Sequence, residues 1–456
     1  MRIVVCVRIG RDGELGPFDA AAYETALRQG GEVILLSMCP SSDNDALLRL
    51  TRLGASQAVL LSDKAFAGAD TLATAYTLSK AIEKLSPDYV FCGRQTLIGD
   101  TAQTGPMTAA LLGISLVQGV MKIEADGDAF LCSTRTSSDI TVKSPALLTF
   151  ERTCELRLPK LRSRLGTLIK WNASDLNSDP SRIGLVGSPT RVVSSFENQS
   201  GKRRCKFIKR SELDSVIKDA LKKSSDILTK KESEYKLPSQ AVLCVGDAPT
   251  DFAKMICDDP CAVYPKDENE LVSLINEKKP LAVFFGSDAD SKRLAAFSAV
   301  KLSLGLCADL TSVEYDGESI YMYRPALSGT LIAKIKSLTV PTMATVRSSE
   351  KESSDMIIAA GYGVKDSLER VKELADFYGA SLASSRRMTD SALMPYEKQV
   401  GLTGRTVAPA VYLAIGISGA VHHVAGMESS GTVIAINPDK NAQIFEYADY
   451  GILEEF

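Results

Sequence analysis

The chain has 456 residues, of which 45% are hydrophobic and 24% are charged, and its formal net charge is −3. Because no basic excess is present to neutralise phosphates, nucleic acid is not expected as a partner. No apolar run approaches the ~20 residues of a membrane helix, and the N-terminus lacks the apolar stretch of a signal peptide. We therefore expect a cytoplasmic protein that is not membrane-embedded, with about three domains.

The first part of the chain alternates short β-rich runs with amphipathic stretches, which predicts a parallel sheet flanked by helices. After Gly119 apolar and polar residues alternate on both sides of an Asp-Gly turn, which indicates a hairpin. The expected strands are Arg2–Val7, Glu32–Ser37, Ala58–Leu61, Tyr89–Cys92 and Ala146–Phe150, and the expected helices are Phe18–Gln29, Asp43–Leu53 and Asp70–Leu85.

The same order of segments recurs later in the chain. PDYVFCGRQ, from Pro87, is echoed by PLAVFFGSD, from Pro280, and SPALLTFER, from Ser144, is echoed by TVPTMATVR, from Thr339. This repetition predicts two related α/β units that pack as a pseudo-twofold pair. The alternative is that any two doubly wound domains look alike. Between the units, Ser194–Gln240 is polar; its middle predicts a charged surface helix and its ends a linker.

The chemistry is concentrated near the C-terminus. There an apolar strand, Ala410–Ile415, is followed by the turn GISGA and by an amphipathic run, Ala420–Met427. Backbone N–H groups at such a turn attract anions, and its small residues leave room for a diphosphate. Tight turns also need small residues without any ligand, so the turn alone leaves both alternatives open.

Cysteine and histidine give no sign of a metal centre. The ten cysteines lack zinc or iron–sulfur spacing, and the only two histidines are the adjacent His422 and His423. An ATP-using enzyme of the adenine-nucleotide hydrolase type is disfavoured because no GxxxxGK[ST] loop occurs. We expect no metal and no catalytic residues for group transfer.

The segment QVGLTGRTVAPAVYLAIGISGAVHHVAGM, from Gln399, resembles the flavin segment of electron-transfer flavoprotein alpha subunits, as do the later AIN and ADYGI. The resemblance implies an FAD site. Its residues would be Ser385, Arg386, Gln399, Val400, Gly401, Leu402, Thr403, Gly404, Ser418, Gly419, Ala420, Val421, His422, His423, Asn437, Glu455 and Phe456.

The resemblance also implies a role for each part of this set. Ser385, Arg386 and the loop 400–404 would face the isoalloxazine, with the Thr403 hydroxyl at N5. Residues 418–420 would hold the diphosphate, and residues 437, 455 and 456 the adenosine end. His423, either cationic or as a neutral hydrogen-bonding group, would stabilise the negative charge of the reduced ring at its C2 carbonyl.

The first half of the chain resembles the beta subunit of the same family, which implies a second adenine nucleotide, AMP or FAD. Gly16 and Ile98 replace polar residues common in the family, which leaves the choice between the two ligands open. The residues that would enclose the nucleotide are Cys6, Gly16, Pro17, Phe18, Asp19, Met38, Gly93, Asp100, Thr101, Ala102, Gln103 and Thr104.

We therefore expect an α/β protein with two related doubly wound, Rossmann-like domains and a C-terminal flavodoxin/DHS-like FAD-binding domain. The expected boundaries are 1–195 (beta-like), 196–239 (arm and linker), 240–348 (shortened alpha-like N-terminal domain) and 349–456 (FAD domain).

By resemblance the chain is a redox carrier, not a substrate-converting enzyme. It would accept electrons from a flavin dehydrogenase of the acyl-CoA dehydrogenase type, or from NADH, and pass them to an acceptor. Electron bifurcation, and the choice between a monomeric fusion and a homodimer, stay open. The alternative is a nucleotide-binding scaffold of the same fold without a redox role, which would purify colourless.

Overall fold

The structure is a computed structural model of the chain and describes residues 1–10, 13–96, 99, 101–134, 137–197, 202–223, 233–326, 331–347, 354–401 and 404–456. The chain forms two compact units. The first consists of Met1–Ser194, Ser233–Arg324 and Ala333–Val346, and the second of Ser195–Glu232, Pro325–Ile332 and Arg347–Phe456. Neither unit is a single stretch of sequence.

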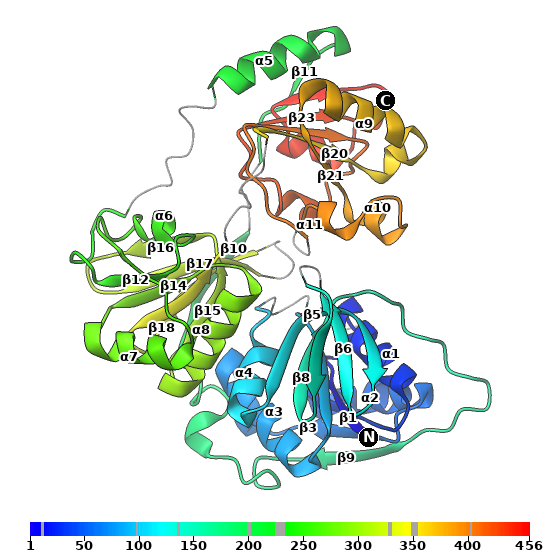
Figure 1. Ribbon diagram of the computed structural model, residues 1–456, viewed down its shortest axis with the longest axis vertical. Helices are drawn as coiled ribbons and strands as arrows, with labels where there is room; N and C mark the ends of the chain where they lie inside the picture. Colours follow the sequence, from blue (N-terminus) through cyan, green and yellow to red (C-terminus); the bar gives the residue numbers. More distant parts are fainter. Residues whose placement is uncertain are drawn as a thin grey trace. The chain divides into compact units, whose positions relative to one another are not determined.

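The N-terminal half of the first unit is built on a nine-stranded sheet with the order β7-β6-β5-β8-β4-β1-β2-β3-β9 (Figure 1). Its strands are β1 (Arg2–Cys6), β2 (Glu32–Met38), β3 (Gln57–Leu61), β4 (Tyr89–Gly93), β5 (Ser115–Asp126), β6 (Ala129–Thr134), β7 (Ile140–Lys143), β8 (Ala146–Phe150) and β9 (Thr167–Trp171). The hairpin β5–β6 is antiparallel, as expected, and the central strands are parallel.

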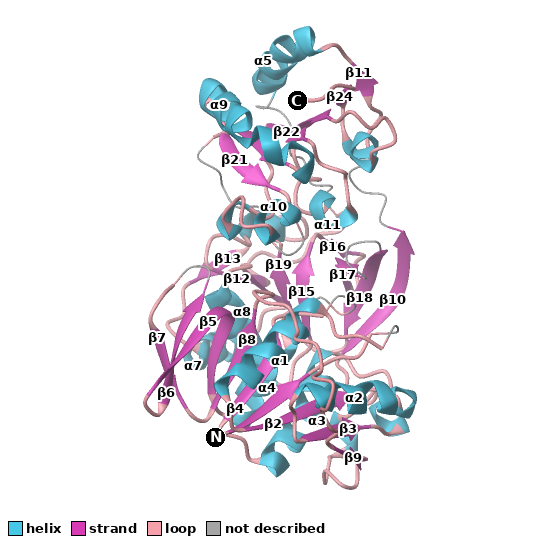
Figure 2. Ribbon diagram, turned by 90° about the vertical axis from the view of Figure 1, so that its right-hand side faces the viewer, coloured by secondary structure: helices cyan, strands magenta, loops and turns pink. Residues whose placement is uncertain are grey.

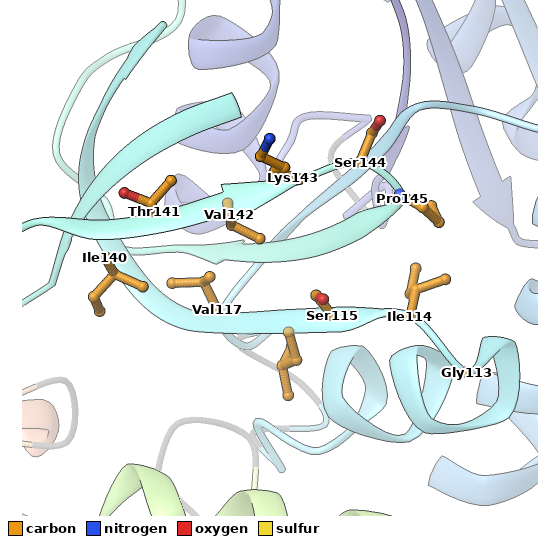
Figure 3. A pocket seen from close by; sticks show the side chains of 11 residues that line it. Gly113, Ile114, Ser115, Val117, Ile140, Thr141, Val142, Lys143, Ser144 and Pro145 are labelled. Atoms are coloured by element: carbon orange, nitrogen blue, oxygen red, sulfur yellow. The ribbon is translucent and has the colours of Figure 1, made fainter. Parts of the chain in front are cut away.

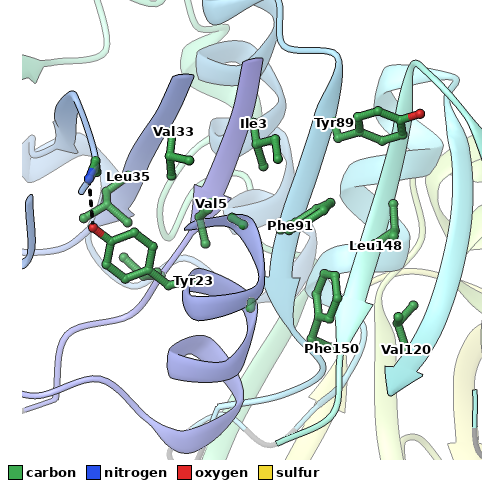
Figure 4. Close-up of a cluster of buried hydrophobic side chains, with 14 of the residues drawn as sticks. Ile3, Val5, Tyr23, Val33, Leu35, Tyr89, Phe91, Val120, Leu148 and Phe150 are labelled. Carbon is green, nitrogen blue, oxygen red and sulfur yellow. Dashed lines mark hydrogen bonds between the residues drawn. The ribbon is translucent and has the colours of Figure 1, made fainter. Parts of the chain in front are cut away.

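Helices cover both faces of this sheet, so its central strands are buried throughout, as the apolar runs predict. The helices are α1 (Pro17–Gln29), α2 (Asn44–Leu50), α3 (Thr71–Leu85) and α4 (Thr104–Leu112). One face packs against α1 and α2 and includes the cluster around Tyr23 and Phe91 in Figure 4. The other face packs against α3 and α4. The expected helix Asp43–Leu53 is broken, because short 3-10 turns flank α2 at both ends.

The C-terminal half of the first unit repeats this arrangement on a smaller scale. Its five-stranded sheet has the order β13-β12-β14-β19-β15, which matches β2-β1-β4-β8-β5 strand for strand. Helices α4 and α8 contribute to one shared apolar cluster. The predicted repeat and its packing as a pair are therefore confirmed. The elements are β12 (Val242–Val245), α6 (Thr250–Ala253), β13 (Cys261–Val263), α7 (Glu268–Lys278), β14 (Ala282–Phe285), α8 (Ala289–Leu302), β15 (Leu306–Leu310) and β19 (Thr342–Val346).

A separate four-stranded sheet has the order β10-β18-β17-β16. Its strands are β10 (Thr190–Glu197), β16 (Ser312–Tyr315), β17 (Ile320–Ala326) and β18 (Leu331–Ser337). The strand β10, at the start of the polar stretch that was expected to be arm and linker, therefore pairs with β18, which lies more than 100 residues later in the sequence.

The second unit is a six-stranded parallel sheet with the order β11-β24-β23-β22-β20-β21. Counted from β20 the order is 2-1-3-4-5, the flavodoxin-like arrangement, with β11 added at one edge. The elements are β11 (Lys206–Phe207), α5 (Leu213–Lys223), β20 (Met356–Ala360), α9 (Leu368–Tyr378), β21 (Ser381–Ser384), α10 (Arg386–Asp390), β22 (Val411–Ile415), α11 (Val421–Val424), β23 (Thr432–Ile436) and β24 (Tyr450–Ile452) (Figure 2).

Part of the expected linker belongs to this second unit. β11 pairs with β24, and Leu213, Ile217 and Ala220 of α5 are buried in the same apolar cluster as β20 and β22. The helix in the polar stretch is present, with its charged residues outside and its apolar face in a core. The domain boundaries themselves stay a prediction.

Candidate functional site

The carboxyl ends of the parallel strands of the second unit form one edge of its sheet. The strand order reverses between β20 and β22, and doubly wound sheets bind ligands in the crevice at such a reversal. Several residues of the predicted FAD site gather at this edge. Ser385 follows β21, the turn 416–420 follows β22, Asn437 follows β23, and Glu455 and Phe456 lie a few residues beyond β24.

The loop 399–405 is fixed to the same edge. Val400 donates its backbone N–H to the Ser384 carbonyl at the end of β21 (3.0 Å), and Gly401 donates to the Arg405 carbonyl (3.0 Å). The Gln399 side chain accepts a hydrogen bond from Thr389 (2.9 Å). Leu402 and Thr403 lie outside the described residues. The hydroxyl predicted to meet N5 of the flavin belongs to Thr403, so its position is not described.

At the strand reversal two backbones touch, which explains the glycines there. A Cβ on Gly361 would lie 2.0 Å from the Gly416 carbonyl oxygen, and Gly416 itself has φ +64°. Gly419 has φ +87°, and a Cβ there would lie 2.0 Å from the Ile444 backbone nitrogen. Only glycine fits at these positions, because neighbouring backbone fills the space that a side chain would take. Ser418 and Ala420 of the turn are exposed.

The Asn437 amide supports this turn. Its Nδ2 donates to the Ile417 carbonyl (2.9 Å), and its Oδ1 accepts the Asp439 backbone N–H (2.9 Å). Both of its polar atoms are therefore used in holding the loops after β22 and β23 together. Its contact with the adenosine end stays a prediction.

His423 is buried directly after the turn. Its Nε2 lies 2.9 Å from the hydroxyl of Tyr412 in β22. Burial lowers the pKa of His423 to about 4, and hydrogen bonding to the Val400 carbonyl opposes this only in part. Of the two forms expected from the sequence, the structure favours the neutral, hydrogen-bonding ring.

We expect the second unit to lose stability as the pH falls, because of His423. Its pKa is lowered from 6.5 to about 4, so between these values the unfolded chain binds a proton that the folded chain does not. The contribution is fully present above pH 6.5 and falls by about 3 kcal/mol as the pH drops to 4. Denaturant unfolding across this range should show a shallower pH dependence for His423→Gln, and equal slopes would contradict the buried neutral ring.

Other predicted residues lie on more exposed surface. Arg386 is 38% exposed, with its Nε 3.4 Å from the Asp390 carboxylate. The Phe456 ring packs against two guanidinium groups, Arg210 at 4.7 Å and Arg370 at 5.3 Å. Tyr362, at the strand reversal, stacks with Arg387 at 4.0 Å. Cations thus surround the edge at which an anionic cofactor is expected.

The residues present fit FAD. The buried Ser384 Oγ finds no hydrogen-bond partner among the described residues, and His423 Nδ1 makes no hydrogen bond of ordinary geometry to them, with only the Val400 backbone acting on the ring. Buried polar atoms are almost always paired, so such orphans indicate a missing group. Together with the exposed Ser418 and Ala420 of the turn, they provide polar groups for the cofactor.

A second candidate site is a cavity of about 790 Å³ in the first unit, at the carboxyl ends of β1, β2 and β4. Of the residues predicted for the second nucleotide, Cys6, Asp19, Met38, Gly93, Thr101, Ala102 and Thr104 line it. Gly16, Pro17, Phe18 and Gln103 do not, and Asp100 lies outside the described residues. Gln103 is fully buried, and its amide finds no partner among the described residues.

Sequence reasoning missed several residues of this cavity. Arg8 and Asp70 could have been found, because each sits where a strand or loop meets a helix at the expected edge. Leu306, Cys307, Ala308, Arg324 and Ile335 could not, because they come from the second half of the repeat. The Arg324 guanidinium donates to the Gly99 carbonyl (2.9 Å) across 225 residues of sequence.

Asp19 anchors the wall of this cavity. Its carboxylate accepts the backbone N–H of Arg8 (2.9 Å), and a Cβ on Gly93 would lie 2.3 Å from its Oδ1. Burial raises the pKa of Asp19 to about 7, although hydrogen bonds from the Arg8 and Gly93 backbones act in the opposite direction. The ends of β1 and β4 are therefore held together by one buried acidic group.

A smaller groove of about 420 Å³ lies between β5 and β7 (Figure 3). It is lined by the aliphatic side chains Ile114, Val117, Ile140 and Val142, with Lys143 as its one ionisable group. It brings together no set of residues that could bind a cofactor. In the described part of the chain no cluster of possible metal ligands occurs, and no helix is long and apolar enough to cross a membrane.

Comparisons with known families match both parts of the chain in which the candidate sites lie. The electron transfer flavoprotein domain matches residues 3–176 and 268–362, which together exceed half of the chain and fall on both halves of the repeat. The electron transfer flavoprotein FAD-binding domain matches residues 351–428, within the second unit. FAD is therefore the cofactor of this unit.

Individual relatives divide in the same way. The electron transfer flavoprotein subunit beta of Thermoanaerobacterium thermosaccharolyticum is 43% identical over 202 residues, covering 41% of this chain and 77% of the relative. The protein FixA of Bradyrhizobium diazoefficiens is 34% identical over 242 residues, covering 47% of this chain and 84% of the relative.

The electron transfer flavoprotein subunit alpha of Thermoanaerobacterium thermosaccharolyticum is 34% identical over 236 residues, covering 42% of this chain and 71% of the relative. Beta-like relatives match the N-terminal part and alpha-like relatives match the rest. The chain therefore belongs to the electron transfer flavoprotein family and combines the parts of both subunits in one polypeptide.

Proposed function

We propose that FAD lies along the carboxyl edge of the second unit's sheet. Its isoalloxazine faces Ser385, Arg386 and the loop 400–404, and its diphosphate lies at the turn 418–420. Its adenosine end extends toward Asn437, Glu455 and Phe456. The observation that carries this placement is the strand reversal, where Gly361, Gly416 and Gly419 let neighbouring backbones meet, and where the buried Ser384 Oγ and His423 Nδ1 lack a hydrogen bond of ordinary geometry to the described residues.

The bound FAD supplies the one- and two-electron chemistry of a carrier. The chain's own residues set its environment. His423 offers a neutral ring to the C2 carbonyl, Arg386 adds a positive charge beside the ring system, and His422 lies next to the same turn. Donors and cations at these positions favour the reduced, more negative flavin.

For the first unit we propose a second adenine nucleotide in the cavity of about 790 Å³, with AMP and FAD as the two alternatives. Support comes from Thr101, Ala102 and Thr104, which line the cavity at the start of α4. Ala102 has φ +53°, and such a left-handed residue turns successive backbone N–H groups toward one point, as in phosphate-binding nests.

The partners proposed are a flavin-containing dehydrogenase of the acyl-CoA dehydrogenase type, or NADH, as donor, and a separate electron acceptor. The first unit presents exposed leucines on the segment that follows β8. Leu158 is 87% exposed and Leu161 is 100% exposed, beside the cations Lys160 and Arg162. Exposed apolar side chains with basic neighbours fit an acidic, partly apolar partner surface.

The proposed function is tested by the colour and cofactor content of the purified protein. We expect a yellow protein that releases, on denaturation, either one FAD and one AMP per chain or two FAD. Its flavin should be reduced when an acyl-CoA dehydrogenase and its substrate, or NADH, are added. A colourless protein that takes up no added FAD would overturn the carrier function and favour the scaffold alternative.

A further inference from the structure

The hydroxyl of Tyr412 is a polar group in the interior of the second unit. Tyr412 is the second residue of β22, in the apolar run VYLAI, and it is fully buried on the face that packs against α11. Its hydroxyl has a single hydrogen-bond partner among the described residues, the His423 Nε2 at 2.9 Å. A buried hydroxyl at this position would be costly without that bond.

Both members of the pair are uncharged at neutral pH. Burial raises the pKa of Tyr412 far above its usual value and lowers that of His423 to about 4. A neutral imidazole has one N–H donor and one lone-pair acceptor. The pair can therefore be arranged in two ways, with the tyrosine hydroxyl donating to Nε2 or with an Nε2 proton donating to the hydroxyl oxygen.

Two contacts favour the first arrangement. If Nε2 carried the proton, the Tyr412 hydroxyl hydrogen would be buried without an acceptor among the described residues, at the cost of an unsatisfied donor. Hydrogen bonding to the Val400 carbonyl also raises the pKa of His423, and a carbonyl oxygen needs a ring N–H as its donor. When Tyr412 donates to Nε2, the ring proton is on Nδ1, and both requirements are met.

The Nδ1 atom is the ring nitrogen that Tyr412 does not engage. It is buried and makes no hydrogen bond of ordinary geometry to the described residues, although the Val400 backbone acts on the ring and raises its pKa. Gly401, in the described part of the loop 399–405, packs on this segment: a Cβ on Gly401 would lie 2.6 Å from the His422 carbonyl oxygen and 3.3 Å from the His423 Cα. This is the loop that we place against the isoalloxazine.

We propose that Tyr412 is a positioning residue that fixes the His423 proton on Nδ1, so that the ring presents a hydrogen-bond donor, and not a lone pair, to the flavin. The inference rests on the proposed function, since it assumes that His423 faces the flavin. A donor at Nδ1 stabilises negative charge on the C2 carbonyl, whereas a lone pair would repel it. Tyr412 thereby raises the reduction potential of a cofactor that it does not touch.

The experiment combines nitrogen NMR with a redox titration of the purified protein. Only two histidines occur in the chain, so [15N]histidine labelling gives two rings, and a His422→Gln variant assigns the His423 signals. At neutral pH we expect His423 to carry its proton on Nδ1. In Tyr412→Phe, which keeps the ring volume, we expect the Nε2–H form to appear and the flavin midpoint potential to become more negative, with FAD still bound.

Tyr23→Phe is the matched control. Tyr23 is also fully buried, and its hydroxyl donates to the Leu50 carbonyl (2.8 Å), but it lies in the first unit. It should change neither the His423 spectrum nor the potential. The inference is overturned if His423 of the unmodified protein carries its proton on Nε2, or if Tyr412→Phe alters neither the tautomer nor the potential. A protein that binds no FAD would instead overturn the proposed function, while the spectrum would still report the tautomer.

Discussion

Replacing Gly419 with alanine is expected to abolish FAD binding at micromolar concentrations while leaving the first unit folded. Gly419 has φ +87°, a conformation that costs an alanine about 1 kcal/mol or more. The added Cβ would also lie 2.0 Å from the Ile444 nitrogen and 2.5 Å from the Gln443 carbonyl carbon, both backbone atoms that cannot rotate away. The turn would have to move from the position at which it meets the diphosphate.

Strain and overpacking together amount to about 3 kcal/mol, which corresponds to more than a hundredfold in the binding constant. The binding constant is measured from flavin fluorescence during titration of the protein with FAD. The matched control is Gly379→Ala at the end of α9, because Gly379 also has a positive φ (+62°) but has open space around its Cβ position. Equal loss of FAD in both variants would show that backbone strain alone is responsible. Unchanged binding in Gly419→Ala would place the diphosphate elsewhere.

Replacing Ile217 with aspartate is expected to unfold the second unit, or to detach α5 from it, although this residue lies in a stretch that reads as linker. Ile217 is fully buried and belongs to the cluster formed by β20 and β22. Burying a carboxylate there without a partner costs several kcal/mol, which is comparable with the total stability of a domain. FAD should be lost, and limited proteolysis should cut the chain within 354–456.

Lys222→Asp provides the comparison on the same helix. Lys222 is exposed, so the same acidic residue is introduced there without burial and should change stability by less than about 0.5 kcal/mol. Thermal unfolding, monitored through the release of flavin, should give clearly different unfolding temperatures for the two variants. Similar behaviour of both would mean that α5 is only a surface connection and that the second unit is complete without it.

The elements and the repeat could be predicted from the sequence because their signals are local. Alternating apolar runs and helical stretches predict β1 to β4 and α1 to α3, and the echo of Pro87–Gln95 in the segment from Pro280 predicts the second sheet. Small residues between an apolar strand and a helix start also indicated the turn after β22, since a tight turn is a property of adjacent residues. The helix that follows is shorter than the amphipathic run Ala420–Met427 suggested, since α11 spans only Val421–Val424.

Only the tertiary structure decided which distant residues meet. The pairing of β11 with β24, the burial of Ile217, and the reach of Arg324 to the Gly99 carbonyl join residues more than 130 positions apart, and no local pattern encodes such contacts. The state of His423 was decided in the same way. Its position after the turn was visible in the sequence, but burial is what favours its neutral form, and its contact with Tyr412, a residue that looks like an ordinary apolar member of its strand, is what carries the proposed tautomer.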